Sequence, residues 1–272
     1  MNILSYSNLS IATLMAAALL SCQGTGGKQQ AYQEDGIQFD SVVVDTTAAL
    51  NANANAPKCQ LHISMQTAKG SRSANINAAI LKSGILTPVY LALMNEKMTI
   101  KQAVDTFVAC YIKDYKNNYD DIYRQEPTSN ALNVSYNLST RTSKGKGNVI
   151  VYTASVYQYE GGDHGVRLTV VKNINPETGK VITLNDVFVP GYQRPLADLI
   201  TGKLEEDKDC DNIDRLRQKG FFVGITPYPS DNFVYGSDGI TFIYCTNEIA
   251  SNAEGEIHVK LSYSEMEKIL KK

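Results

Sequence analysis

The pattern of apolar and polar residues divides the chain into a short apolar block and a long patterned remainder. Residues 11–20 form an apolar run, and a polar stretch at residues 23–30 follows almost at once. A helix that crosses a bilayer needs about 20 apolar residues, so this run is too short to span one. It has the length of the apolar region of a signal peptide. We therefore predict a leader over residues 1–21 and a flexible, Gly- and Gln-rich tether over residues 22–35.

Several segments of the remainder have the pattern of strands. Cys59, Leu61, Ile63 and Met65 alternate with polar residues, which is the period-two signature of a half-buried strand. Similar runs at residues 131–142, 148–159 and 165–174 predict three successive strands, and the second of these is apolar on both sides, as expected of a covered central strand. Short turns between such runs favour an antiparallel meander.

One long helix is predicted over residues 100–119. Its apolar side chains recur at spacings of three and four residues, which places them on one face. Thr99 and Gln102 have the spacing of a capping box at its start. A tyrosine recurs every fourth residue, at Tyr111, Tyr115 and Tyr119. This stripe could be a ladder that stacks on carbohydrate, but a core stripe with hydroxyls at its edge is the favoured interpretation.

Helices and mostly antiparallel strands in separate runs predict an α+β fold, with one or more antiparallel sheets and packed helices. We expect two α+β modules, over residues 36–147 and 148–272. Near the end of the chain, Ser262 and Glu265 have the spacing of a cap, so a last helix is predicted after them.

Charge and histidine spacing narrow the possible partners. The net charge is −2 and the isoelectric point is near 6.0. A nucleic-acid-binding protein would need a clustered basic face, so this class is excluded. The three histidines, His62, His164 and His258, are scattered, whereas a zinc site usually takes three or four protein ligands. We expect no metal and no cofactor.

Four cysteines follow the predicted tether, at Cys59, Cys110, Cys210 and Cys245. In an exported chain they can form disulfides, and four cysteines allow three pairings that the sequence does not separate. Buried free thiols are an equally good interpretation.

The end of the apolar run contains a recognisable processing signal. Leu19-Leu20-Ser21-Cys22 resembles the lipobox of bacterial lipoproteins, in which the cysteine is diacylated and becomes the mature N-terminus. The resemblance implies a lipid anchor on Cys22 and a place in the cell envelope, at the outer membrane or the periplasmic face. The alternative is a buried N-terminal helix with an incidental cysteine.

Several short segments of the second half occur in the order known from one extracytoplasmic domain. They are residues 159–165 (Tyr-Glu-Gly-Gly-Asp-His-Gly), residues 175–188, Asn232-Phe233, residues 239–244, residues 248–250 and Gly255. Together they resemble the domain shared by the lysozyme-sensing anti-sigma factor RsiV and the peptidoglycan deacetylase PdaC. Many lipoproteins of gut Bacteroidetes look similar along their full length. The resemblance covers residues 148–272, and residues 36–147 look like the module that usually precedes this domain.

The resemblance implies an α+β fold and an envelope location, but not catalysis. In the deacetylase the chemistry belongs to a separate domain, and the metal-binding Asp and His motifs of that domain are absent here. In the family the short motif usually reads Gly-Gly-Ala-His-Gly, whereas Asp163 replaces the small residue in this chain.

The same motif contains the candidate ligand-binding residues. Gly161 and Gly162 allow positive φ or close approach of a partner. Asp163 and His164 offer an acceptor and a titratable donor, beside the ring of Tyr159, which could stack on a sugar. The alternative is a tight strand connection whose polar residues satisfy local backbone groups.

We therefore expect a non-catalytic envelope lipoprotein that binds a lysozyme-like protein or a cell-wall glycan. An alternative is an enzyme that acts on cell-wall glycan through carboxylates such as Asp163, Asp186 or Glu248. Such an enzyme needs two carboxyl groups about 5–10 Å apart in a cleft. A third interpretation is an architectural subunit of an envelope complex, which would expose a large apolar patch.

Overall fold

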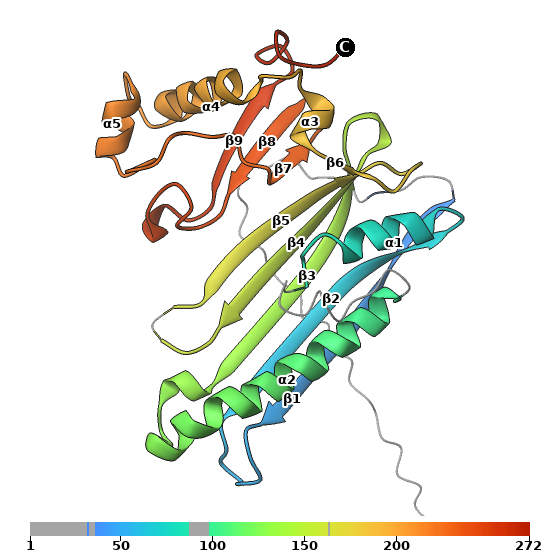
Figure 1. Cartoon of the computed structure of the whole chain (residues 1–272), viewed down its shortest axis with the longest axis vertical. Coiled ribbons are helices and arrows are strands. Elements are labelled where there is room, and N and C mark those ends of the chain that lie inside the picture. The colour runs from blue at the N-terminus through green and yellow to red at the C-terminus, as the bar shows by residue number, and fades with distance from the viewer. Residues whose placement is uncertain (1–31, 33–35, 87–97, 163) are drawn as a thin grey trace, which may run out of the picture.

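The chain folds into two β-sheets with helices packed on them, as seen in a computed structural model (Figure 1). The structure describes residue 32 and residues 36–86, 98–162 and 164–272. The predicted leader, Cys22 and the tether apart from Tyr32 therefore lie outside the described residues. The expected α+β class is confirmed.

The large sheet has six strands in chain order, β1 (Ile37–Ala49), β2 (Lys58–Gly70), β3 (Val134–Lys144), β4 (Ile150–Tyr159), β5 (Val166–Ile174) and β6 (Val181–Ile182). Every neighbouring pair is antiparallel except β2 and β3, which run parallel. A parallel pair needs a long crossover. Here the crossover contains α1 (Ser73–Leu81) and α2 (Ile100–Gln125), which cover one face of the sheet (Figure 1).

The small sheet has three antiparallel strands, β7 (Phe233–Tyr235), β8 (Gly239–Tyr244) and β9 (Ile257–Ser262). Three helices precede it, α3 (Leu184–Val187), α4 (Gln193–Asp207) and α5 (Ile213–Gln218). Short 3-10 helices lie at η2 (Asn130–Leu132), η3 (Lys146–Asn148) and η4 (Asn252–Glu254). The apolar face of α4 packs into the same buried cluster as β8 and β9.

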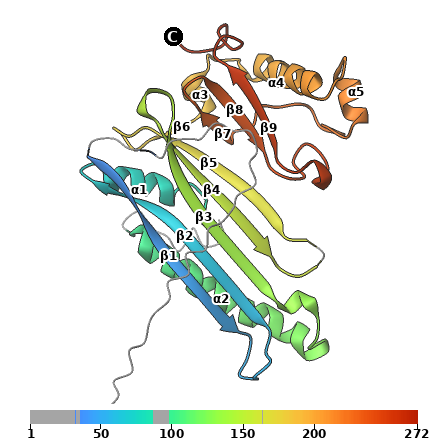
Figure 2. The same ribbon diagram turned by 180° about the vertical axis from the view of Figure 1, so that it is seen from behind.

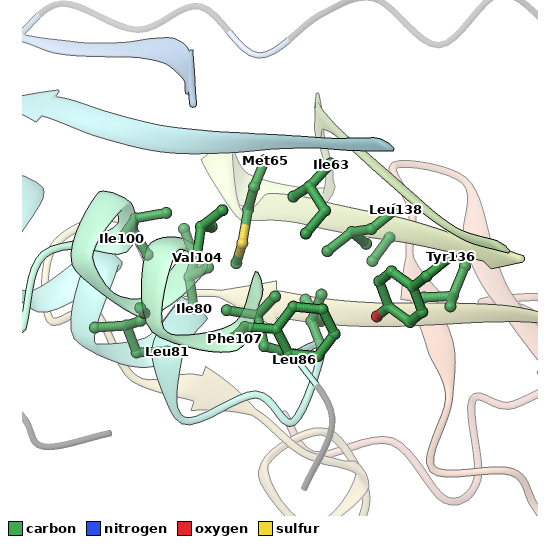
Figure 3. Packing of buried hydrophobic residues seen from close by; sticks show 14 of the residues in the cluster. Ile63, Met65, Ile80, Leu81, Leu86, Ile100, Val104, Phe107, Tyr136 and Leu138 are labelled. Atoms are coloured by element: carbon green, nitrogen blue, oxygen red, sulfur yellow. The ribbon is translucent and has the colours of Figure 1, made fainter. Parts of the chain in front are cut away.

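The long helix α2 forms where its periodicity predicted it and continues to Gln125. The capping box is present, because the Thr99 side chain accepts from the backbone of Gln102 and the Gln102 side chain accepts from the backbone of Thr99. Ile100, Val104 and Phe107 are buried and face the apolar side chains of β2 and β3, including Ile63, Met65, Tyr136 and Leu138 (Figure 3). The alternation that predicted β2 therefore places its apolar half under this helix.

The predicted last helix is wrong. Ser262 and Glu265 do form the capping contacts, with the Ser262 amide donating to Glu265 Oε2 at 2.7 Å. Residues 263–269 nevertheless form turns. Leu270 pairs with Phe188 in an isolated bridge, and the Lys271 amide donates to a carbonyl of α3. These backbone contacts draw the chain into an extended path within a few residues of the cap.

The expected boundary between residues 147 and 148 lies inside the large sheet. Strands β3 and β4 flank it and are paired along ten positions, from Ser135 opposite Tyr159 to Lys144 opposite Ile150. The buried side chains separate later, because one apolar cluster extends to Ile174 and the next begins at Leu184.

Asn232 joins the small sheet to the large one. Its side chain accepts a hydrogen bond from the Val171 amide at 2.7 Å and donates to the Thr169 carbonyl at 2.7 Å. Both partners are backbone groups of β5, so the side chain lies along this strand in the way a neighbouring strand would.

Asn173 makes the reciprocal arrangement from β5. Its amide nitrogen donates to the Phe233 carbonyl at 2.8 Å, and its oxygen accepts from the Tyr235 amide at 2.9 Å. Together Asn173 and Asn232, which we call the asparagine clasp, satisfy backbone groups of β5 and β7 where no ladder joins them. A small apolar cluster of Val151, Val171 and Ile243 is buried beside the clasp.

Removal of the Phe107 ring should strongly destabilise the packing of α2 on the large sheet. The side chain is fully buried, with ring centroids 5.6 Å from Tyr111 and 4.9 Å from Tyr136. We expect Phe107→Ala to lower the free energy of unfolding by about 3–5 kcal/mol in urea titrations. Ile122→Ala, at a 38% exposed position of the same helix, is the control and should cost far less. Equal losses would contradict the packing of α2 described above.

Loss of either side chain of the asparagine clasp should also destabilise the fold. Asn173→Ala and Asn232→Ala each leave two backbone groups without partners, for which we expect about 2–3 kcal/mol per variant. The double variant should cost less than the sum, because both side chains hold the same junction. Asn252→Ala, at an exposed position of η4, should change stability by less than about 0.5 kcal/mol. Clasp variants as mild as this control would show that the junction rests on the apolar cluster instead.

Candidate functional site

The candidate motif closes the hairpin between β4 and β5. The two strands are paired as far as Gln158 opposite Val166, so residues 159–165 form the connecting loop. The loop lies at the end of the strands away from β6 (Figure 1). His164 is exposed, and its side chain makes no hydrogen bond or ion pair within the described part of the chain. Asp163 lies outside the described residues.

The two motif glycines have different roles. Gly161 has φ +86°, and a Cβ there would lie 2.3 Å from Cα of Ala131 in η2. Glycine is therefore required for close approach of the loop to η2 as well as for its backbone conformation. Gly162 has φ +93° but faces open space, so only its backbone conformation favours glycine.

Local hydrogen bonds hold the loop. The Tyr159 hydroxyl donates to the Gly162 carbonyl at 3.0 Å, and the Gln158 amide donates to Glu160. These contacts fit the interpretation in which polar residues satisfy their own turn. They commit the hydroxyl of Tyr159, whereas the imidazole of His164 stays available to a ligand.

Gly165 supports a residue that the sequence did not single out. A Cβ on Gly165 would lie 2.4 Å from the ring of Tyr157, so this ring rests directly on the glycine. The guanidinium of Arg167 lies 4.6 Å from the centroid of the same ring. Tyr157 is opposite Arg167 in the β4–β5 register. The strand alternation could have predicted this pair, but not the diagonal contact with Gly165.

The tyrosine stripe of α2 belongs to the core. Tyr111 and Tyr115 are buried, and the Tyr115 hydroxyl donates to the Leu132 carbonyl at 2.8 Å. Burial raises the pKa of Tyr115 to about 12. The side chains that pack against the sheet are not available for stacking on a carbohydrate.

The described carboxylates that were candidates for catalysis have structural partners. Asp186 caps α3, accepting from the Thr183 amide at 2.8 Å and its hydroxyl at 2.7 Å, and these hydrogen bonds lower the pKa of Asp186. Glu248 accepts from the Cys245 amide at 2.7 Å and from the Tyr228 hydroxyl at 2.7 Å. Each carboxylate is thus engaged in its own turn.

The four cysteines beyond the predicted tether are free thiols in the structure. Cys59 is fully buried in β2, and burial raises the pKa of its thiol to about 11. A thiol with this pKa is a poor nucleophile near neutral pH. Cys59 is therefore a buried free thiol, as one of the two interpretations of the sequence expected. None of the three disulfide pairings that the four cysteines allow is present in the structure.

Neither a metal cluster nor a membrane span is found in the described part of the chain. No three His, Cys, Asp or Glu side chains there converge as a metal site would require. His62 lies 3.5 Å from Asp45, and His258 contacts Glu256, so these two histidines pair with carboxylates on separate sheets. Of the described helices, none is both long and apolar enough to cross a membrane.

Comparison with known proteins agrees with the fold. Residues 185–264 match the family model described as a protein of unknown function (DUF3298), and this range coincides with the small-sheet unit. The chain is similar to a solved DUF3298 family member from Bacteroides fragilis, with a TM-score of 0.78 and 24% identity over 89% of this chain and 96% of that one.

A second solved structure shows the same architecture at greater distance. A DUF3298 family protein from Pseudomonas aeruginosa gives a TM-score of 0.56 and 14% identity, over 87% of this chain and 95% of that one. No curated protein sequence matches the chain. At these identities the two solved structures establish a shared fold. The match to the DUF3298 model over residues 185–264 locates the family resemblance in the part of the chain that contains the small sheet.

Proposed function

We propose that the chain is a non-catalytic, lipid-anchored protein of a bacterial cell envelope that binds a ligand outside the cytoplasm. The observation that supports binding most directly is the β4–β5 loop, where His164 is exposed and has no partner within the described residues. An exposed loop held by a rigid hairpin is a common place for recognition residues. The resemblance of this loop to the RsiV domain favours a lysozyme-like protein or a cell-wall glycan as the ligand.

The proposal of a non-catalytic role follows from the environment of the carboxylates. A glycan hydrolase needs an acid and a second carboxylate that face a shared cleft. Asp186 and Glu248 instead accept hydrogen bonds within their own turns. An architectural role would rest on a large exposed apolar patch. The exposed apolar side chains of the described residues are instead spread over several elements, such as Val43 in β1 and Val223 after α5.

The proposal of a lipid anchor rests on the Leu19-Leu20-Ser21-Cys22 tetrad. Each buried CH₂ of an acyl chain contributes about 0.8 kcal/mol, so two chains would hold the protein firmly on a membrane.

Ligand binding predicts a defined effect of loop substitutions. The full-length chain should retain lysozyme or soluble muropeptides in a pull-down. His164→Ala and Asp163→Ala should each lower the affinity for the retained ligand about tenfold or more, as loss of a charged hydrogen bond does. Asp211→Ala, an exposed acidic position outside the loop, is the control and should bind normally. Retention of neither probe would refute the proposed ligands, and normal binding by both loop variants would remove the loop from the site.

The anchor predicts covalent labelling at a single position. Cells that express the chain should incorporate a palmitate analogue into it, and Cys22→Ala should abolish the label and release the protein from the membrane fraction. Cys110→Ala, which changes a half-buried thiol of α2, is the control and should keep the label. Equal labelling of the Cys22→Ala variant would contradict the anchor without affecting the ligand proposal.

A further inference from the structure

Among the residues that the structure describes, no helix covers one face of the large sheet. Helices α1 and α2 lie on the other face, and the view from behind shows β1 to β5 open to the viewer (Figure 2). The small sheet packs near one end of this open face, where Val151 and Val171 are buried against Ile243. The part of the open face toward the β4–β5 loop lies outside this contact.

The strand register arranges the open face into polar rows. In one row Ser64, Ser139, Ser155 and Thr169 are neighbours on β2, β3, β4 and β5. Neighbouring strands are about 4.8 Å apart, so the row places a hydroxyl at each step. The hydroxyl of Thr169 is hydrogen-bonded to Glu256. Ser139 and Ser155 are exposed, and within the described residues the hydroxyls of Ser64, Ser139 and Ser155 have no hydrogen-bond partner in the protein.

The next two rows toward the loop are also rich in hydrogen-bonding groups. His62, Asn137, Tyr157 and Arg167 form one of them, and Gln60, Ser135 and Tyr159 form the other. In the three rows, the described positions of β2 to β5 contain no Lys, Asp or Glu. A face that is merely solvated usually carries these residues in abundance, whereas Tyr and Arg are typical of binding surfaces.

Two exposed arginines lie on this face, although the whole chain has a net charge of −2. Arg141 on β3 and Arg167 on β5 flank the hydroxyl row, and neither forms a salt bridge within the described part. The described acids nearest to this face are Asp45, which is exposed and lies 3.5 Å from His62, and Glu256, which contacts His258.

Glu256 is an anion that contacts both sheets, through His258 on β9 and Thr169 on β5. Burial raises its pKa, but hydrogen bonds with His258 and Thr169 and the charge of Arg141 outweigh burial and hold the pKa below its usual value. The carboxylate is therefore ionised near neutral pH and does not leave the histidine unpaired. Arg141 therefore already interacts with one carboxylate of the chain, whereas Arg167 has no acidic partner within the described residues.

Tyr157 gives the face an aromatic platform beside the loop. Its ring rests on Gly165 and is flanked by Arg167, so it lies low on the sheet surface. The hydroxyl end of the ring lies over Gly165, because a Cβ there would be 2.6 Å from the Tyr157 hydroxyl oxygen, so the ring points toward the loop. The last glycine of the loop motif therefore shapes this face.

We propose that the open face of β2 to β5 binds a carboxylate-bearing glycan. Its sugar hydroxyls would pair with the rows of hydroxyl and amide side chains, and its carboxylates with Arg141 and Arg167. A guanidinium binds a carboxylate through two parallel hydrogen bonds, which suits both positions. This inference rests on the proposed function and specifies the ligand class and the surface.

A protein ligand fits this surface less well. Protein interfaces depend on a few apolar or aromatic anchors in a desolvated centre. The rows on β2 to β5 are mostly hydroxyl and amide side chains. Their two aromatic residues are engaged locally, since the Tyr157 ring rests on Gly165 and the Tyr159 hydroxyl donates within its loop. The large exposed apolar side chain opposite Ser64 is Val43, on the edge strand β1. Lysozyme binding through this face is therefore one of the outcomes that the test separates.

The test measures binding of polygalacturonate oligomers to the full-length chain by calorimetry. The unmodified oligomers should bind, and the same oligomers with methyl-esterified carboxyl groups should bind at least about tenfold more weakly, since charge-assisted hydrogen bonds are the stronger ones. Arg141→Gln with Arg167→Gln should weaken binding to the same extent, and Ser155→Leu should block it by filling the hydroxyl row.

Lys113→Gln with Lys116→Gln is the matched control. It removes the same charge from the exposed side of α2, on the opposite side of the sheet, and should leave binding unchanged. The surface proposal is overturned if the arginine double variant binds like the unmodified chain, if the lysine control loses as much affinity, or if the oligomers do not bind at all.

These outcomes are separable from failure of the proposed function. If lysozyme or muropeptides are retained and lost only on His164→Ala, ligand binding stands and the glycan face is wrong. If no probe of either class binds, both proposals fail together.

Discussion

The asparagine clasp is the constraint on which the arrangement of the two sheets depends. Strands β5 and β7 approach each other without a regular ladder, so their backbone groups would be unsatisfied at a partly buried junction. Two carboxamides solve this problem because each has both a donor and an acceptor and can copy the hydrogen bonds of a peptide group. Asn173 and Asn232 do so from opposite sides.

The clasp also determines what remains open. It attaches the small sheet at the Val151 and Val171 end of the large sheet, so within the described part of the chain the small sheet does not cover the rows near the β4–β5 loop. The loop, Tyr157 and the hydroxyl row then share one continuous side of the molecule. Their common location is a consequence of a junction that lies several residues away from each of them.

Much of the fold could be predicted from periodicity because burial decides it locally. The alternation from Cys59 to Met65 and the helical spacing from Ile100 to Tyr115 record which side chains face the core. The parallel pairing of β2 and β3 could not be predicted, since it joins residues such as Cys59 and Val134 that are distant in sequence. The turns after Ser262 were missed because a cap favours a helix locally, whereas the bridge of Leu270 to Phe188 is a tertiary contact.

The candidate site could be predicted only in part. Glycines and polar residues between two strands marked the loop, and Gly161 indeed needs the absence of a side chain. Composition did not reveal that Tyr159 satisfies its own loop or that Gly165 supports Tyr157. The polar rows depend on the register of four strands, and this register follows from strand pairings that cannot be predicted from a single sequence. For the same reason the carboxylates Asp186 and Glu248 looked available until their turns were seen.

The free thiols show which interactions hold this fold together. Cys59, Cys110, Cys210 and Cys245 form no covalent cross-link, and the structure buries its apolar clusters without one. Small exported domains often rely on oxidation to hold a limited core together. The described part of this chain is instead held by side-chain packing and hydrogen bonds. A reducing agent is therefore expected to leave these packed clusters in place.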